Sequence, residues 1–168
     1  MPVGLPSPRS SVGCDIAGRP HTVGPVSSEL ADNVRATAED AVALLVDEYG
    51  DALDFSVPSL VLVDEVLDRY AQTLADAPEP AVRNFTQLVS CYVLEVGRRE
   101  FGGTYQWWHE RNAPVLVVGE PTFHVSLLAA DKVAGRLSGD RSDSIPFLYE
   151  GFAERARTAT PGTSVTYV

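Results

Sequence analysis

Apolar residues recur every three or four positions through three segments of the first hundred residues. The segments cover 27–49, 53–76 and 81–101. This spacing is the repeat of a helix that buries one face, so the sequence predicts three amphipathic helices. Ser56 can cap the second helix, and Pro58 stands in its first turn, where the missing N–H costs no hydrogen bond. The predicted buried positions are Leu30, Val34, Ala38, Ala41, Leu45 and Tyr49 in the first helix, Leu60, Val63, Leu67, Tyr70 and Leu74 in the second, and Phe85, Leu88, Val89, Tyr92, Val93 and Val96 in the third.

The glycine pair 102–103 ends the third predicted helix, and the apolar pattern changes there. Glycine adopts backbone angles that other residues resist, so the pair can turn the chain out of helical geometry. Beyond it, apolar and polar residues alternate in three short segments, 104–110, 114–119 and 122–128, separated by turn residues. Alternation is the repeat of a strand, and these segments predict an antiparallel meander. Residues 115–118 are apolar at every position, as expected of a middle strand covered on both sides.

The remaining segments complete the predicted organisation. Two further helices are predicted at 129–137 and 144–157. Residues 1–26 are rich in Pro, Gly and Ser without an apolar repeat, which predicts a flexible arm before a single domain at 27–158. Residues 159–168 are predicted to be a tail that can add a short edge strand. The predicted fold class is α+β, with three amino-terminal helices packed on a small antiparallel three-stranded meander, followed by two carboxy-terminal helices.

The balance of charge narrows the choice of partner. The 168 residues include 13 basic and 23 acidic ones, a formal net charge of −10. A field of this sign repels phosphate and anionic lipid, so neither nucleic acid nor a membrane surface is expected as a partner, whereas a basic protein is. Solubility alone is the alternative reason for such a charge. Paired carboxylates such as Asp64 and Glu65 fall on the solvent-facing side of a predicted helix.

Compartment and cofactors follow from what the sequence lacks. It has no apolar run long enough to cross a bilayer, and its first residues lack the apolar core of a signal peptide, so the expected location is the cytoplasm. Cys14 and Cys91 are too few for a disulfide framework, and the helical apolar pattern around Cys91 predicts a buried thiol. We find no phosphate-binding glycine loop and no nucleophile elbow, and we expect no cofactor.

Three blocks of the sequence resemble a known family. LDFSVPSLVLVDEVL, YVLEVGRREFGGTYQW and DKVAGRLSGDRSDSIPFLY are similar to the pattern S..SL..LD..L, Y..EV.RR..GG.W and KV..RL..G..DS...FY of a group of small bacterial domains of unknown function. The resemblance implies helices packed against a small antiparallel sheet. It implies no activity, because the family has no established one. The sequence departs from the pattern at Cys91 and Tyr92, which stand before Leu94 and Glu95 where a small residue often precedes the glutamate.

Glu95 and Arg99 are the first candidates for chemistry. They stand four residues apart near the buried face of the third predicted helix, a spacing that favours an ion pair. One interpretation is a structural bridge at the end of the helix, with the stem of Arg99 packed on apolar neighbours. The other is a partly buried pair at the mouth of a cleft over the sheet. There Glu95 could serve as an acid or base, and Arg99 could hold an anionic group of a substrate.

Two tryptophans lie side by side in the segment 104–110. Alternation places Tyr105, Trp107 and His109 on one face of the predicted strand and Trp108 on the other. The two indoles cannot enter one core unless helices cover both faces, so we expect one of them to be partly exposed and able to anchor a partner. Tyr105, Trp107 and Trp108 are therefore candidate binding residues. Burial of both indoles under other segments is the alternative.

Two histidines fall on different predicted strands. His109 is a candidate acid or base, and both His109 and His124 are candidate binding residues. With Glu110 or Glu120 nearby they could bind zinc or share a proton. A zinc site normally shows three close ligands at helical or knuckle spacing, so we expect no metal site, and solvated surface histidines are the simpler interpretation.

Two functions are compatible with these residues. The favoured one is a small acidic cytoplasmic binding protein without catalytic activity, for example an inhibitor or immunity-type partner of a basic protein, anchored by an exposed tryptophan. The alternative is a small enzyme or small-molecule binder with a pocket between the third helix and the sheet. Glu95 and Arg99 would open into that pocket, and Trp107, Trp108 or His109 would line it. The sequence leaves the oligomeric state open.

Overall fold

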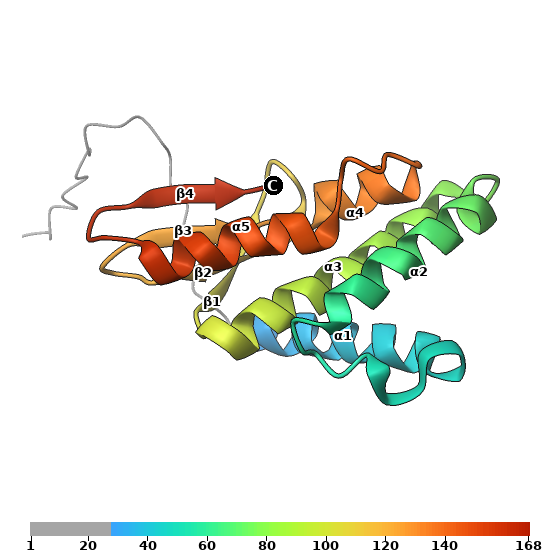
Figure 1. The fold of residues 1–168 in the computed structure, drawn as a ribbon, viewed down its shortest axis with the longest axis horizontal. Coiled ribbons are helices and arrows are strands. Elements are labelled where there is room, and N and C mark those ends of the chain that lie inside the picture. Colours follow the sequence, from blue (N-terminus) through green and yellow to red (C-terminus); the bar gives the residue numbers. More distant parts are fainter. Residues whose placement is uncertain (1–27) are drawn as a thin grey trace, which may run out of the picture.

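The computed structural model describes residues 28–168, so the predicted arm at 1–26 lies outside the described residues. The described chain forms an α+β fold in which helices come first, strands follow, and two helices and a strand close the chain (Figure 1). The elements are α1 (Ser28–Tyr49), a short 3-10 turn (Gly50–Ala52), α2 (Ser59–Leu74), α3 (Glu79–Phe101), β1 (Thr104–Trp108), β2 (Ala113–Val118), β3 (His124–Leu127), α4 (Ala130–Leu137), α5 (Ile145–Thr158) and β4 (Ser164–Tyr167).

α1 and α3 match their predicted segments within two residues, but α2 begins at Ser59, and Pro58 rather than Ser56 takes its N-cap position. The buried side chains include Val34, Ala38, Ala41 and Leu45 of α1, Leu60, Val63, Val66 and Leu67 of α2, and Phe85, Val89, Tyr92, Val93 and Val96 of α3. The other predicted positions, Leu30, Tyr49, Tyr70, Leu74 and Leu88, are only partly buried. In α3 the whole run 89–97 is buried, because other elements cover the helix on several sides. No helix of residues 28–168 combines the length and apolar composition that a membrane span requires.

The predicted three-stranded antiparallel meander is wrong, because the sheet has four strands and is mixed. β1 pairs antiparallel with β2, and β2 pairs antiparallel with β3, as predicted. The segment predicted as a tail supplies β4, which pairs parallel with β3 in the order β1-β2-β3-β4. β2 is buried at every position, as its unbroken apolar run predicts.

The sequence allows the tail to add a short edge strand, but it does not predict the parallel pairing with β3, and the reason is physical. SVTY is only four residues long, and so short an alternation does not distinguish a strand from an extended tail. A parallel pair needs a long crossover connection, and here α4 and α5 supply it between β3 and β4. The pairing therefore depends on where α5 packs, which is a tertiary property.

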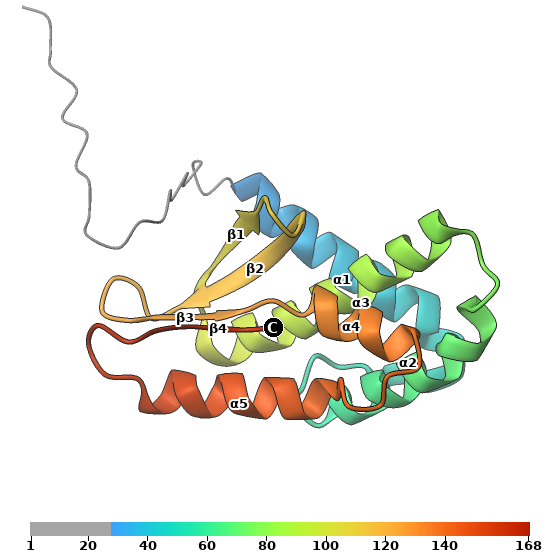
Figure 2. The same cartoon turned by 90° about the horizontal axis from the view of Figure 1, so that it is seen from above.

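The helices and the sheet share one core. α3 contacts β2, and α5 runs along β3 and β4 (Figure 1). α1 and α5 lie on opposite sides of α3 (Figure 2). The side chains of Tyr105, Leu116, Val125 and Leu127 point from the sheet into this core. A second, smaller apolar cluster forms on the other side of the sheet, where Trp108 packs against Ala113, Val115, Val117 and Leu128.

The glycine pair ends α3 as predicted and brings β1 close to β2. Gly102 has φ 71° and ψ −141°, angles that few other residues adopt. Gly103 has φ 94°, and a Cβ there would lie 2.3 Å from the carbonyl oxygen of Val117. Space around Gly102 is open, with no atom within 4 Å of such a Cβ.

We expect Gly103→Ala to lower the free energy of unfolding by about 2 kcal/mol for two reasons. Alanine is strained at this positive φ, and its methyl group would clash with the carbonyl oxygen of Val117. Gly102→Ala is the matched control, with the backbone penalty but no clash, and should cost about 1 kcal/mol. Urea denaturation followed by circular dichroism measures both. Equal losses for the two variants would contradict the close approach at Gly103.

Candidate functional site

Glu95 lies in the interior, near the end of α3. Its side chain is 3% exposed, and both carboxylate oxygens have partners. Oε1 accepts a hydrogen bond from Nε of Arg99 at 3.0 Å, and Oε2 accepts one from the hydroxyl of Tyr105 at 2.8 Å. The ion pair predicted from the spacing is therefore present, and it has a third member on β1. A buried carboxylate with two donors is well compensated for its loss of water.

Arg99 extends this network to the loop between α1 and α2. Its guanidinium carbon Cζ lies 3.9 Å from the ring centre of Phe55, and the Phe55 ring stacks on Tyr92 with centroids 4.7 Å apart. Phe55 has φ 61°, an unusual value for a residue with a bulky side chain. Its N–H donates to the hydroxyl of Tyr92 at 3.0 Å, and that hydroxyl also bonds Oγ of Ser59 at 2.6 Å. The stack holds the loop against α3.

The tyrosines of this network stay neutral at physiological pH. Burial, together with the bond to Glu95 and the charge of that carboxylate, raises the pKa of Tyr105 far above its ordinary value. Burial also raises the pKa of Tyr92. The neighbouring Cys91 is buried as predicted, and burial raises the pKa of its thiol to about 12, so it is not a thiolate at neutral pH.

The two tryptophans of β1 have different surroundings. Trp107 is 39% exposed, which makes it one of the exposed large apolar side chains of the described chain. Trp108 is partly buried in the second apolar cluster, and its indole N–H donates to Glu110 at 3.4 Å. Of the two predicted anchors, Trp107 is the more exposed.

The two histidines lie apart from Glu95. His109 is exposed in the turn after β1. His124, at the start of β3, is about one-third exposed, and its Nδ1 lies 2.9 Å from Oε1 of Glu120. Among residues 28–168, no group of three or more His, Cys, Asp or Glu side chains is arranged to hold a metal ion.

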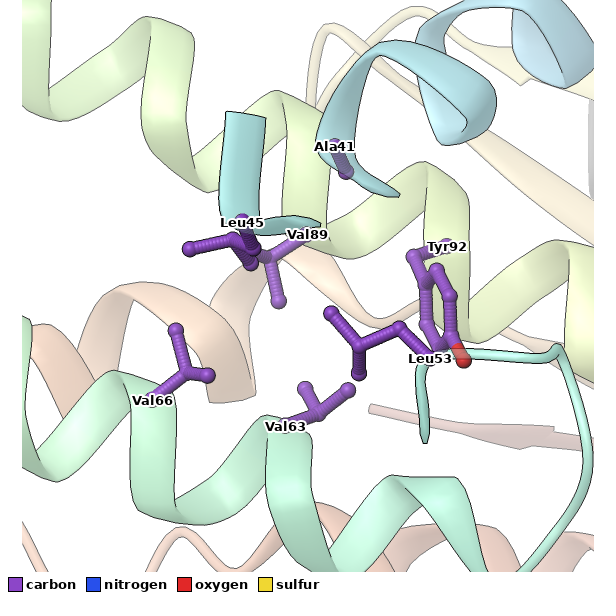
Figure 3. Close-up of a pocket in the computed structure, with 7 residues that line it drawn as sticks. All are labelled: Ala41, Leu45, Leu53, Val63, Val66, Val89 and Tyr92. Carbon is purple, nitrogen blue, oxygen red and sulfur yellow. The ribbon is translucent and has the colours of Figure 1, made fainter. Parts of the chain in front are cut away.

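A small apolar void lies beside α3, on the side where α1 and α2 pack (Figure 3). Its volume is about 10 Å³, about the smallest that can hold one water molecule. Side chains of Leu45, Leu53, Val63, Val66 and Val89 surround it, together with Ala41 and the ring of Tyr92 (Figure 3). With no polar lining to hold a water, it is a packing defect of the core and is too small for a substrate.

A charged junction that the sequence did not indicate joins α2, α4 and α5. Arg136 of α4 is 5% exposed, and its guanidinium donates to both carboxylate oxygens of Asp64, with Nε to Oδ1 at 3.2 Å and Nη2 to Oδ2 at 2.9 Å. Asp64 also accepts the N–H of Ile145, the first residue of α5, at 3.0 Å. Asp68 adds a weaker contact with Arg136 at 3.5 Å.

Asp64 is thus not the wholly solvated carboxylate that its place on the helix predicts. One signal in the sequence could have indicated the junction. Arg136 stands between Val133 and Leu137 in the apolar stripe of α4, and a buried arginine requires a carboxylate partner. The junction residues also line an open surface groove of about 660 Å³, whose lining holds three acidic and three basic side chains in all.

The outer side of α1 carries a second concentration of charge. Glu29, Asp32, Glu39, Asp40 and Asp47 are all exposed along it; we call this surface the acidic face of α1. Asp32 pairs with Arg35 at 3.2 Å, and the contacts described for residues 28–168 include no ion pair for the other four carboxylates.

No protein-family model matches this chain, and neither a curated protein nor a solved structure matches it. The resemblance of three sequence blocks to small bacterial domains stays a prediction. What the protein can do follows from its own charges, contacts and surfaces.

Proposed function

We propose that this protein is a non-catalytic binding protein whose partner is a basic protein. The observation that carries the proposal is the concentration of negative charge in one part of the chain. Residues 28–54, which form α1 and the loop after it, hold eight of the 23 acidic residues and one of the 13 basic residues. Their formal charge is −7, beside −10 for the whole chain. A one-sided field of this kind attracts a cationic partner and speeds its encounter.

The interior supports binding rather than catalysis. A general acid or base must reach the proton that it transfers, but Glu95 is buried and both of its oxygens are bonded. Nε of Arg99, which could have held an anionic substrate group, donates to Glu95 instead, and its guanidinium lies over the ring of Phe55. Through these contacts, Glu95 and Arg99 form a structural link between α3, β1 and the loop before α2.

A salt-dependent binding measurement tests the proposal. The probe is a helical peptide of about 20 residues, about 30 Å long, with arginine along one side; the control peptide has glutamate in place of every arginine. We expect the arginine peptide to bind at about 0.01 M salt and to weaken about tenfold or more at about 0.15 M, where the Debye length falls from about 30 Å to about 8 Å. Calorimetry measures both affinities. No binding of the arginine peptide at low salt, or equal binding of the glutamate peptide, would overturn the proposal.

A further inference from the structure

The acidic face of α1 is organised in rows that repeat every seven residues. α1 has 22 residues, which makes it about 33 Å long. Ala36 and Ala43 stand seven residues apart and are both exposed. Residues seven apart lie two turns apart on nearly the same side of a helix, so the two alanines mark a line of small side chains along the outer surface.

Carboxylates border this line on both sides. One border carries Asp32 and Glu39, and the other carries Asp40 and Asp47; each pair again has a spacing of seven. A line of small residues lets a second helix approach closely, and charged side chains along its borders can pair with charges of that helix, as they do at the flanking positions of coiled coils. The face thus has the pattern of one half of a helix pair.

Apolar side chains extend the surface beyond the acidic face. Leu44 of α1 is 55% exposed and Val46 is 44% exposed. The end of β1, which carries the exposed Trp107, lies beside the amino-terminal end of α1 (Figure 2). The surface therefore offers an apolar contact next to a row of negative charges, and tryptophan is enriched among residues that contribute most to binding.

We infer that the partner docks on α1 through an amphipathic helix of its own whose charged residues are arginine or lysine. The cations pair with the two rows of carboxylates, small or apolar side chains cover Ala36 and Ala43, and Trp107 contacts one end of the helix. This inference rests on the proposed function and adds where, and with what kind of segment, the basic partner binds. The exposed side of α5 offers no equivalent, because it carries Arg155 and Arg157 as well as Glu150 and Glu154.

Matched charge variants of the full chain test the location. The face variant combines Glu39→Gln, Asp40→Asn and Asp47→Asn. The control variant combines Asp76→Asn, Glu150→Gln and Glu154→Gln, which removes the same charge from exposed positions elsewhere. With the arginine peptide at low salt, we expect the face variant to bind about tenfold more weakly than the unchanged chain, and the control variant to change by no more than about twofold. Circular dichroism confirms that each variant is folded.

Two neutral variants test the geometry. Ala43→Gln adds bulk on the line of small residues without changing charge, and Trp107→Ala removes the apolar contact. Each should weaken binding of the arginine peptide about fivefold or more. Equal weakening by the two triple variants, or unchanged binding by both neutral variants, would overturn the inference while the proposed function stands. A peptide that binds none of the proteins, including the unchanged chain, would instead contradict the proposed function itself.

Discussion

Asp64→Ala should lower the free energy of unfolding by about 3 kcal/mol, the largest loss that we expect from one surface-accessible side chain. The reason is that Arg136 is 5% exposed and would keep its charge in the interior after losing its main partner. The N–H of Ile145 would also lose its acceptor at the start of α5. Asp68, at 3.5 Å, is too distant to replace the lost bonds in full.

Two further variants show how much of the lost stability comes from the unpaired charge of Arg136 and how much from removing any carboxylate side chain. Glu65→Ala removes the exposed neighbouring carboxylate and should cost less than about 0.5 kcal/mol. Arg136→Met replaces the buried cation with an apolar chain of similar length and should cost clearly less than Asp64→Ala, because no buried charge is left unpaired. Urea denaturation gives the three values. A loss for Asp64→Ala as small as that for Glu65→Ala would contradict the role of the junction.

Glu95→Ala should cost about 3 kcal/mol by a related mechanism. Tyr105 as a whole residue is 2% exposed, so its hydroxyl would lose its acceptor at a place that water does not reach. The deletion also leaves a space among packed side chains, and Arg99 loses the carboxylate that holds it over Phe55. We expect the loop before α2 to become more mobile, with faster hydrogen exchange at the N–H of Phe55.

Conservative variants at the same site give smaller effects. Glu95→Gln keeps an acceptor for Tyr105 and should cost about half as much as the alanine variant. Arg99→Met should cost only about 1 kcal/mol, because the Arg99 side chain is 45% exposed and water can replace part of its contacts. If Glu95→Gln and Glu95→Ala were equally destabilising, the charge rather than the bond to Tyr105 would be the main contribution. If neither were destabilising, the structural role assigned to Glu95 would be wrong.

The candidate site was partly predictable from the chain. The four-residue spacing predicts the pair between Glu95 and Arg99, and alternation predicts that the neighbouring indoles lie on opposite faces of β1. Spacing could not show that Tyr105 is the third member of the network, because its hydroxyl reaches Glu95 only after β1 folds back along α3. The partner of Arg136 was hidden for the same reason, since 72 positions separate it from Asp64.

The sequence by itself determined the elements that depend on neighbouring residues. The periods of apolar residues located α1, α2, α3 and the first three strands, and the glycine pair marked the change between them. Ser144, a residue type that favours the helix N-cap, caps α5 by accepting the N–H of Phe147 at 3.4 Å.

Only the tertiary structure decided which distant segments meet. It added β4 parallel to β3, buried Arg136 against Asp64, and left Trp107 more exposed than Trp108. The physical reason is that periodicity reports whether a side chain faces inward, whereas its partner depends on how elements far apart in the sequence pack together.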